Sequence, residues 1–231
     1  MLPVIGFSEE QTRIIHEILA DADTALKNCV RNCDPVSSKF KEEFRYWFSE
    51  ESDNNEPSVK LLIWTVKQMR DRLEEPGGRL VVSCCDKPHI MNGDYGNVKN
   101  LPHLLERTEE RPGKPVRAAV NVRETIDSYY QAGNKGKIRL ASKVLDLDRY
   151  SRYGVSQLLV FLHELSHWAA GTRDLKETSK ADTPEGTIPQ RCYGTSTGVV
   201  SAVMRGKYPD GTMRAVQNAD TVGFFVTSFF T

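Results

Sequence analysis

The sequence lacks an excess of either charge sign, and it lacks any long apolar run. Its 231 residues include 31 Lys and Arg against 31 Asp and Glu, so the formal net charge is zero. Without a basic excess or a polybasic segment, nothing in the composition favours binding to nucleic acid or to an anionic membrane. No apolar run reaches the roughly 20 residues that a membrane-spanning helix needs. We therefore expect neither nucleic acid nor a membrane as a partner.

Cysteine is also scarce, and its spacing excludes a common class of zinc module. The five cysteines are Cys29, Cys33, Cys84, Cys85 and Cys192. An odd number excludes complete pairing within the chain. The chain has no C-x-x-C, so a structural zinc ribbon has no support. We interpret Cys29 and Cys33, four residues apart on a predicted helix, as buried thiols. A disulfide from this pair to Cys84 or Cys85 is the alternative.

Helical periodicity dominates the first third of the chain. Ser8 and Gln11 have the spacing of a capping box, and the apolar positions that follow predict a helix from Glu9 to about Asn32. An aromatic-rich helix is predicted around Phe40 to Phe48, with its aromatic side chains in the core. Pro57 suits the first turn of a third helix, which Pro76-Gly77-Gly78 would end.

The remaining two thirds predict a small sheet and further helices. Strands or extended segments are expected at Arg79–Cys84, Val116–Val122 and Ile138–Leu147, long loops at Asp86–Gly113 and Asp174–Cys192, and helices at Val155–Gly171, Thr197–Arg205 and Thr212–Thr227. At this length one domain is expected. We predict a single helix-rich α+β domain over residues 1–231, with a helical part at about 8–75 and a second part at about 79–231, in which a small β-sheet lies beside the helix around residue 163.

One segment carries chemistry, because His163-Glu164-Leu165-Ser166-His167 reads H-E-x-x-H within an apolar stretch. Residues four apart share one face of a helix, so His163 and His167 can bind one metal ion. Glu164 lies beside them as a candidate general base for a metal-activated water. This pattern is typical of a zinc hydrolase. The alternative is a surface helix whose two histidines bind no metal.

A catalytic zinc site needs a third protein ligand. The metzincin pattern H-E-x-x-H-x-x-G-x-x-H fails, because Ala170 and Arg173 occupy its later positions. Glu185 lies at a distance tolerable for a thermolysin-like ligand, but it follows Pro184 in an apparent loop. Asp174 is the better candidate, since Gly171 can end the helix in a left-handed turn that brings the chain back towards the metal.

These residues resemble the aspzincins, the family of deuterolysin and peptidyl-Lys metalloendopeptidases. The family signature is H-E-x-x-H, then G-T-x-D, then Tyr-Gly. The chain has Gly171-Thr172-x-Asp174 after its H-E-x-x-H, and later Tyr193-Gly194. Asn218-Ala219-Asp220-Thr221 with Phe224-Phe225 resembles the family's C-terminal N-A-D-S/T-Y-x-x-F segment, and Arg45-Tyr46-Trp47-Phe48 resembles its R-Y-x-x-W-F segment. The chain departs from the family pattern at two places. Eighteen residues separate Asp174 from Tyr193, and Val222 stands where the C-terminal segment of the family has its Tyr.

The resemblance implies a zincin-type metalloendopeptidase that acts on a protein or peptide substrate. One Zn²⁺ per chain would be bound by His163, His167 and Asp174, with Glu164 as the base. Tyr193 would donate a hydrogen bond to the oxyanion, or else it anchors a loop. We interpret Asp220 as a residue that holds a ligand histidine or the loop rather than as a ligand itself; the alternative is a plain Asp on a helix surface.

The family also implies secretion or export, although the segment Met1–Phe7 is too short and uncharged for a secretory signal. A cytoplasmic location is the alternative. Two other functions stay open: a zinc-bound binding module without turnover, and a delivered effector or toxin protease with one protein target. Acidic residues Asp182, Glu185 and Asp210 could hold a substrate lysine, but a solvated loop is the simpler interpretation. The sequence leaves the oligomeric state open.

Overall fold

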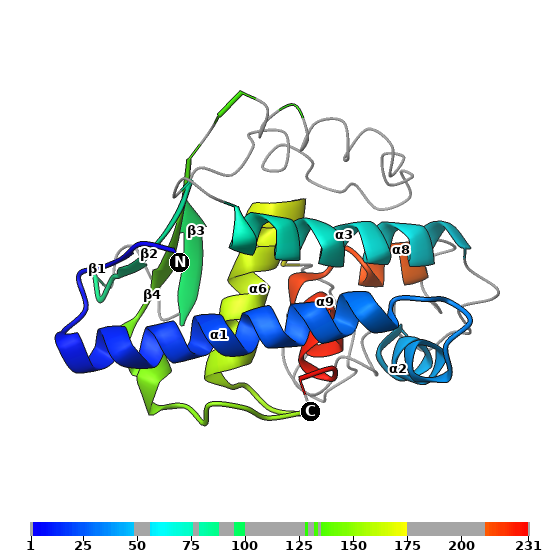
Figure 1. The fold of residues 1–231 in the computed structure, drawn as a ribbon, viewed down its shortest axis with the longest axis horizontal. Helices are drawn as coiled ribbons and strands as arrows, with labels where there is room; N and C mark the ends of the chain where they lie inside the picture. Colours follow the sequence, from blue (N-terminus) through cyan, green and yellow to red (C-terminus); the bar gives the residue numbers. More distant parts are fainter. Residues whose placement is uncertain are drawn as a thin grey trace, which may run out of the picture.

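The computed structural model describes residues 2–48, 56–75, 79–87, 95–99, 128, 132–133, 135–174 and 211–230. The chain combines helices with a small sheet, as predicted (Figure 1). In chain order the elements are β1 (Val4–Ile5), α1 (Glu9–Asn32), α2 (Ser38–Phe48), α3 (Glu56–Glu74), β2 (Leu80–Cys84), β3 (Gly96–Lys99), β4 (Gly136–Leu140), the 3-10 helix η2 (Ser142–Asp146), α6 (Gln157–Ala170), α8 (Gly211–Ala215) and α9 (Ala219–Thr227).

The N-terminal helices follow the sequence prediction closely. Helix α1 begins at the predicted capping box, in which Ser8 and Gln11 satisfy each other's backbone N–H groups. Its apolar face packs on α3 and α6. The aromatic side chains of α2 are buried as expected, and the Trp47 ring stacks on Phe224 of α9 with ring centroids 5.0 Å apart. Aromatic contacts of this kind fix α2 against α9.

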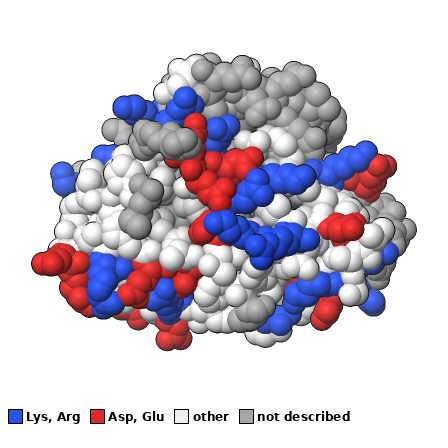
Figure 2. Space-filling model, viewed as in Figure 1, with Lys and Arg blue, Asp and Glu red and all other residues white. Residues whose placement is uncertain are grey.

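The outer face of α1 and α3 carries both signs of charge, interspersed along the two helices (Figure 2). Lys27 of α1 forms ion pairs with Asp23 of its own helix at 2.8 Å and with Glu74 of α3 at 3.1 Å. Exposed pairs of this kind contribute little stability, because water and salt screen them. The burial of apolar surface beneath these helices therefore does most to hold them together.

The sheet has four strands in the order β1-β2-β4-β3. Strands β1, β2 and β4 are parallel, and β3 is antiparallel to β4, with Gly96 opposite Leu140. Helix α6 packs against both β3 and β4, so the sheet lies beside the H-E-x-x-H helix as predicted. One cluster of buried apolar residues joins the N-terminal helices, the sheet, α6 and α9. Among the described residues, no helix is both long and apolar enough to cross a bilayer.

Three boundary predictions need correction. Strand β3 lies inside the predicted loop Asp86–Gly113, because pairing with β4 makes a strand of residues with weak strand patterning. The predicted extended segment Ile138–Leu147 is a strand only to Leu140. It then turns into η2, where the Asp86 carboxylate accepts from the Ser142 N–H at 2.7 Å. The predicted helix Thr212–Thr227 is two helices, α8 and α9.

The structure tests the predictions for four of the five cysteines. Cys29 and Cys33 are buried as predicted, with their Sγ atoms 3.8 Å apart. Cys84 and Cys85 are free thiols, so the disulfide alternative is wrong for these four residues. The strand predicted at Val116–Val122 and the helix predicted at Thr197–Arg205 lie outside the described residues.

Candidate metal centre

Helix α6 brings the two histidines of the H-E-x-x-H motif together. Every residue of the helix is buried except His163, whose side chain is 12% exposed. A helix that is apolar on all sides is stable only inside a core, and α1, α3, α9 and the sheet surround this one. The Nε2 atoms of His163 and His167 lie 3.0 Å apart. The sequence prediction that these two side chains share one face is confirmed.

The hydrogen bonds of the two rings fix which nitrogen is free. Nδ1 of His163 lies 2.6 Å from a carboxylate oxygen of Asp220, and Nδ1 of His167 lies 2.7 Å from the carbonyl oxygen of Thr172. A carbonyl or an ionised carboxylate only accepts, so each Nδ1 must carry the proton and donate it. In a neutral ring the Nε2 atom then presents a lone pair. The two Nε2 atoms lie 3.0 Å apart, so they meet at a point that either a proton or a metal cation can occupy.

The turn after α6 brings Asp174 to the same point. Gly171 ends the helix in the left-handed region, with φ 67°, and its N–H donates to the His167 carbonyl. A residue with a Cβ is strained in that conformation. The returning chain places Asp174 Oδ1 3.1 Å from His163 Nε2 and 3.3 Å from His167 Nε2. His163, His167 and Asp174 can therefore hold one metal ion, as the sequence predicted.

A buried pair of hydroxyl groups holds this turn against the helix. Ser166 Oγ donates to the His163 carbonyl at 2.7 Å and lies 2.6 Å from the Thr172 hydroxyl. Because the single Ser166 proton is used on a carbonyl, Thr172 must donate in the second contact. The roles of Ser166 and Thr172 were not predicted from the sequence. A serine inside an apolar helix was the available signal, since such hydroxyls usually bond to the backbone.

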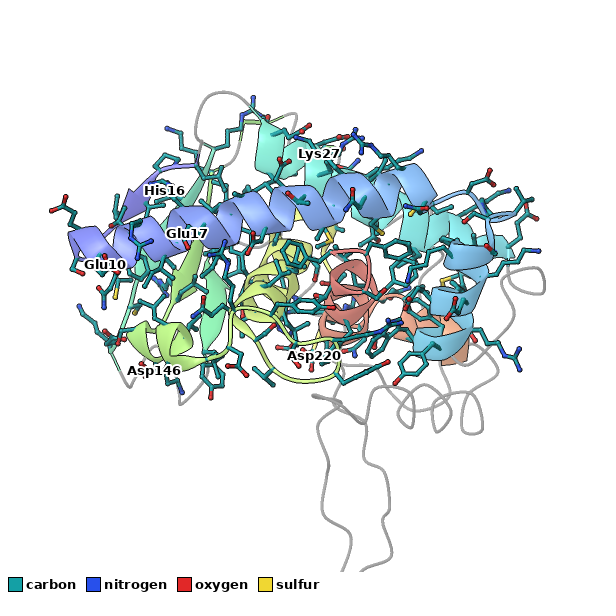
Figure 3. The ribbon with its side chains drawn as sticks, turned by 60° about the horizontal axis from the view of Figure 1, so that its bottom comes forward. Glu10, His16, Glu17, Lys27, Asp146 and Asp220 are labelled. Atoms are coloured by element: carbon teal, nitrogen blue, oxygen red, sulfur yellow. The ribbon has the colours of Figure 1, made fainter. Side chains whose placement is uncertain are left out.

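The segment at the start of α9 pairs with the turn that carries Asp174. The backbone of Arg173 pairs with the segment that begins α9: its N–H donates to the Gln217 carbonyl and its carbonyl accepts from the Ala219 N–H, both at 2.9 Å. This pairing explains why α8 and α9 are separate helices. Asp220, in the first turn of α9, is labelled in Figure 3. Its contact with His163 places it beside a candidate ligand histidine, as the interpretation expected.

Electrostatic interactions within the cluster are strong. Burial acts to lower the pKa of His163, but hydrogen bonds to the Asp174 and Asp220 carboxylates outweigh it and raise that pKa well above its usual value. Burial acts to raise the pKa of Asp174, and hydrogen bonds from His163 and His167 overcome it, so this pKa is lowered. Both pKa shifts show that the carboxylates around the two Nε2 atoms favour positive charge at that point. A divalent metal ion would replace the proton that His163 otherwise carries there.

Glu164 completes the described part of the site. It is 5% exposed, and its Oε1 lies 3.9 Å from His163 Nε2. Its carboxylate thus borders the point where the three ligand atoms meet, in the position the motif predicts for a base. The predicted Tyr193 and the alternative ligand Glu185 both lie outside the described residues.

The donor set fits a metal ion with an open position. Ligand atoms bound at about 2 Å in a tetrahedral site lie about 3.3 Å apart. The three separations in the site are 3.0, 3.1 and 3.3 Å, so a small shift would let all three atoms bind one ion. No fourth protein ligand joins the group among the described residues. No protein-family model matches the chain, and no curated protein matches it significantly. The likeness to the aspzincins therefore stays a prediction from the motifs.

The ligand role of Asp174 is tested by comparison with Glu185. Asp174→Ala should weaken Zn²⁺ binding by more than about 100-fold, since losing a direct ligand should cost at least as much as losing an outer partner. Glu185→Ala is the matched control and should leave the affinity unchanged. Competition with a chromophoric chelator measures both affinities. The reverse result would point to a thermolysin-like ligand set.

The role of Asp220 is tested by Asp220→Asn, which keeps the shape of the side chain. An amide can donate to Nδ1 of His163 and so favour the tautomer whose proton sits on Nε2, where the metal should bind. We expect Zn²⁺ affinity to fall by about 10- to 100-fold with the fold intact. The control is Asp146→Asn, an exposed carboxylate of η2. Equal affinities in the two variants would remove Asp220 from the metal site.

Proposed function

We propose that this protein is a zinc-dependent endopeptidase of aspzincin type. The observation that carries the proposal is the meeting of His163 Nε2, His167 Nε2 and Asp174 Oδ1 at one point, with the Glu164 carboxylate beside it. A metal site with three protein ligands leaves a position for water, which is the arrangement of catalytic zinc sites. Structural zinc sites usually close the fourth position with a protein ligand, and they have no need of a neighbouring base.

Zinc is the metal that the donor set favours. Two imidazole nitrogens and one carboxylate oxygen form a mixed set of ligands, whereas Mg²⁺ and Ca²⁺ prefer oxygen atoms alone. Both imidazoles are held as Nε2 ligands by partners on their Nδ1 atoms, which is the usual second layer of a zinc site. A bound zinc ion would lower the pKa of a coordinated water to about 7 and polarise the scissile carbonyl.

Glu164 would supply the proton transfers. Its carboxylate would accept a proton from the attacking water and then donate it to the departing amine, so that one group serves as base and later as acid. Asp220 and the Thr172 carbonyl would keep both histidines in the tautomer that binds metal throughout the cycle.

Glu164→Gln tests this assignment. The amide cannot accept the proton, so we expect casein hydrolysis to fall by at least about 100-fold, within the range that general acid–base groups contribute. Zinc content and melting temperature should stay close to those of the wild type. A variant that digests casein at nearly the wild-type rate would show that Glu164 is not the base. A wild type that binds zinc but leaves casein intact would favour a non-catalytic module or a protease with one specific target.

We also propose, from the Tyr193-Gly194 motif alone, that the Tyr193 phenol donates a hydrogen bond to the oxyanion. Such a bond acts mainly in the transition state, so its loss should lower kcat more than it raises KM. Tyr193→Phe should reduce kcat by about 100-fold with unchanged zinc content. The control Tyr208→Phe should be silent. An equally silent Tyr193→Phe would leave Tyr193 with a structural role.

A further inference from the structure

Strand β3 begins with Gly96, and the backbone gives no reason for a glycine there. Among the described glycines, only Gly6, Gly133 and Gly171 have a positive φ. Gly96 is therefore in a conformation that any residue can adopt. A glycine within a strand also weakens the strand, because it orders a flexible backbone without adding a side chain to the core. The explanation must lie in the space beside its Cα.

The side chain of Glu164 occupies that space. A Cβ added to Gly96 would lie 2.8 Å from Glu164 Cγ, 2.8 Å from its Oε1 and 3.0 Å from its Cδ. Carbon atoms in contact normally lie about 3.5 to 4.0 Å apart, so an alanine at position 96 would force something to move. Gly96 and Glu164 are both buried, which leaves little empty space to take up the shift.

The strand has little freedom to retreat. Gly96 lies opposite Leu140 in the antiparallel pair of β3 and β4, and the Ala141 N–H donates to the Tyr95 carbonyl at 2.8 Å. Strand β4 is itself paired with β2 on its other side. The helix backbone is equally fixed in the core. The Glu164 side chain is therefore the part that would yield.

We propose that Gly96 is a positioning residue for Glu164: the bare backbone at the start of β3 is the wall against which the carboxylate rests beside the metal ligands. This inference rests on the proposed function, in which Glu164 is the base. A methyl group at position 96 would meet the Glu164 side chain first, since its three nearest neighbours are all Glu164 atoms, and would displace the carboxylate from the attacking water. Displacements of about 1 Å at a reacting group can cost about 100-fold in rate.

The first test is kinetic and uses Gly96→Ala. We expect kcat on a casein-derived peptide to fall by about 100-fold, with KM nearly unchanged and with full zinc affinity by chelator competition. The matched control is Val98→Ala, two residues along the same strand and on the same face. It removes apolar contacts and should leave kcat unchanged. A Gly96→Ala enzyme with wild-type kcat, or one that no longer binds zinc, would overturn the proposal.

The second test uses stability and needs no activity. Gly96→Ala should lower the melting temperature by about 3 °C in the wild type. It should leave that temperature unchanged or raise it in a Glu164→Ala background, because truncation removes the contacting atoms. The control Val98→Ala should lower the melting temperature equally in both backgrounds. If the Gly96→Ala variant fails to fold alone but the double variant with Glu164→Ala folds, that result also supports the contact between Gly96 and Glu164.

An equal loss of stability from Gly96→Ala in both backgrounds, or failure to fold in both, would overturn the proposal. The two tests also separate this inference from the proposed function. If the wild type cleaves no protein or peptide, the proposed function and the positioning role both fall, whereas a melting-temperature coupling would still establish the contact between Gly96 and Glu164.

Discussion

The site depends on the hydrogen bonds that the two imidazole rings make on the side away from the metal position. Asp220 and the Thr172 carbonyl each accept a proton from an Nδ1 atom, which forces both Nε2 lone pairs towards a single point. With both rings neutral, the two lone pairs would repel each other at 3.0 Å, and a proton or a metal cation between the Nε2 atoms removes that repulsion. The surrounding fold thus holds two ligands in an arrangement that a cation would relieve.

The rest of the molecule is arranged to hold those acceptors still. Thr172 belongs to the turn that Gly171 makes possible, and Asp220 belongs to the first turn of α9. The backbone of Arg173 joins the turn to the start of α9, so both acceptors are parts of one hydrogen-bonded unit. Aromatic packing between α2 and α9 then connects this unit to the N-terminal helices. On the opposite side of α6, strand β3 lies against Glu164.

Much of this could be predicted from the sequence, because the relevant signals are local. The H-E-x-x-H spacing depends only on the helix repeat, and the limits of α1 follow from a capping box and a regular apolar face. Gly171 at the helix end predicted the turn that brings Asp174 back. A role for Asp220 in holding a ligand histidine or the loop was also among the predictions, and the structure places its carboxylate against His163, although 57 residues separate the two.

The features that could not be predicted from the sequence depend on contacts between segments that lie far apart in the chain. Strand β3 has little strand patterning of its own and is defined by its partner β4, so its residues alone predict a loop. The break between α8 and α9 exists because Asn218 and its neighbours pair with Arg173, a partner that no local pattern reveals. The contact of Gly96 with Glu164 is likewise a matter of space between two distant segments. The hydroxyl pair of Ser166 and Thr172 depends on the turn that follows the helix.

The central claim is that His163, His167 and Asp174 bind the zinc ion on which proteolysis depends. The most direct measurement is a Zn²⁺ titration of protein that has been stripped of metal by a chelator and then dialysed, with casein hydrolysis followed at each addition. If these three residues bind that ion, the stripped protein should hydrolyse no casein, and the rate should rise linearly with added zinc and level off at one Zn²⁺ per chain. Hydrolysis by the metal-free protein, or no hydrolysis at any zinc concentration, would contradict it.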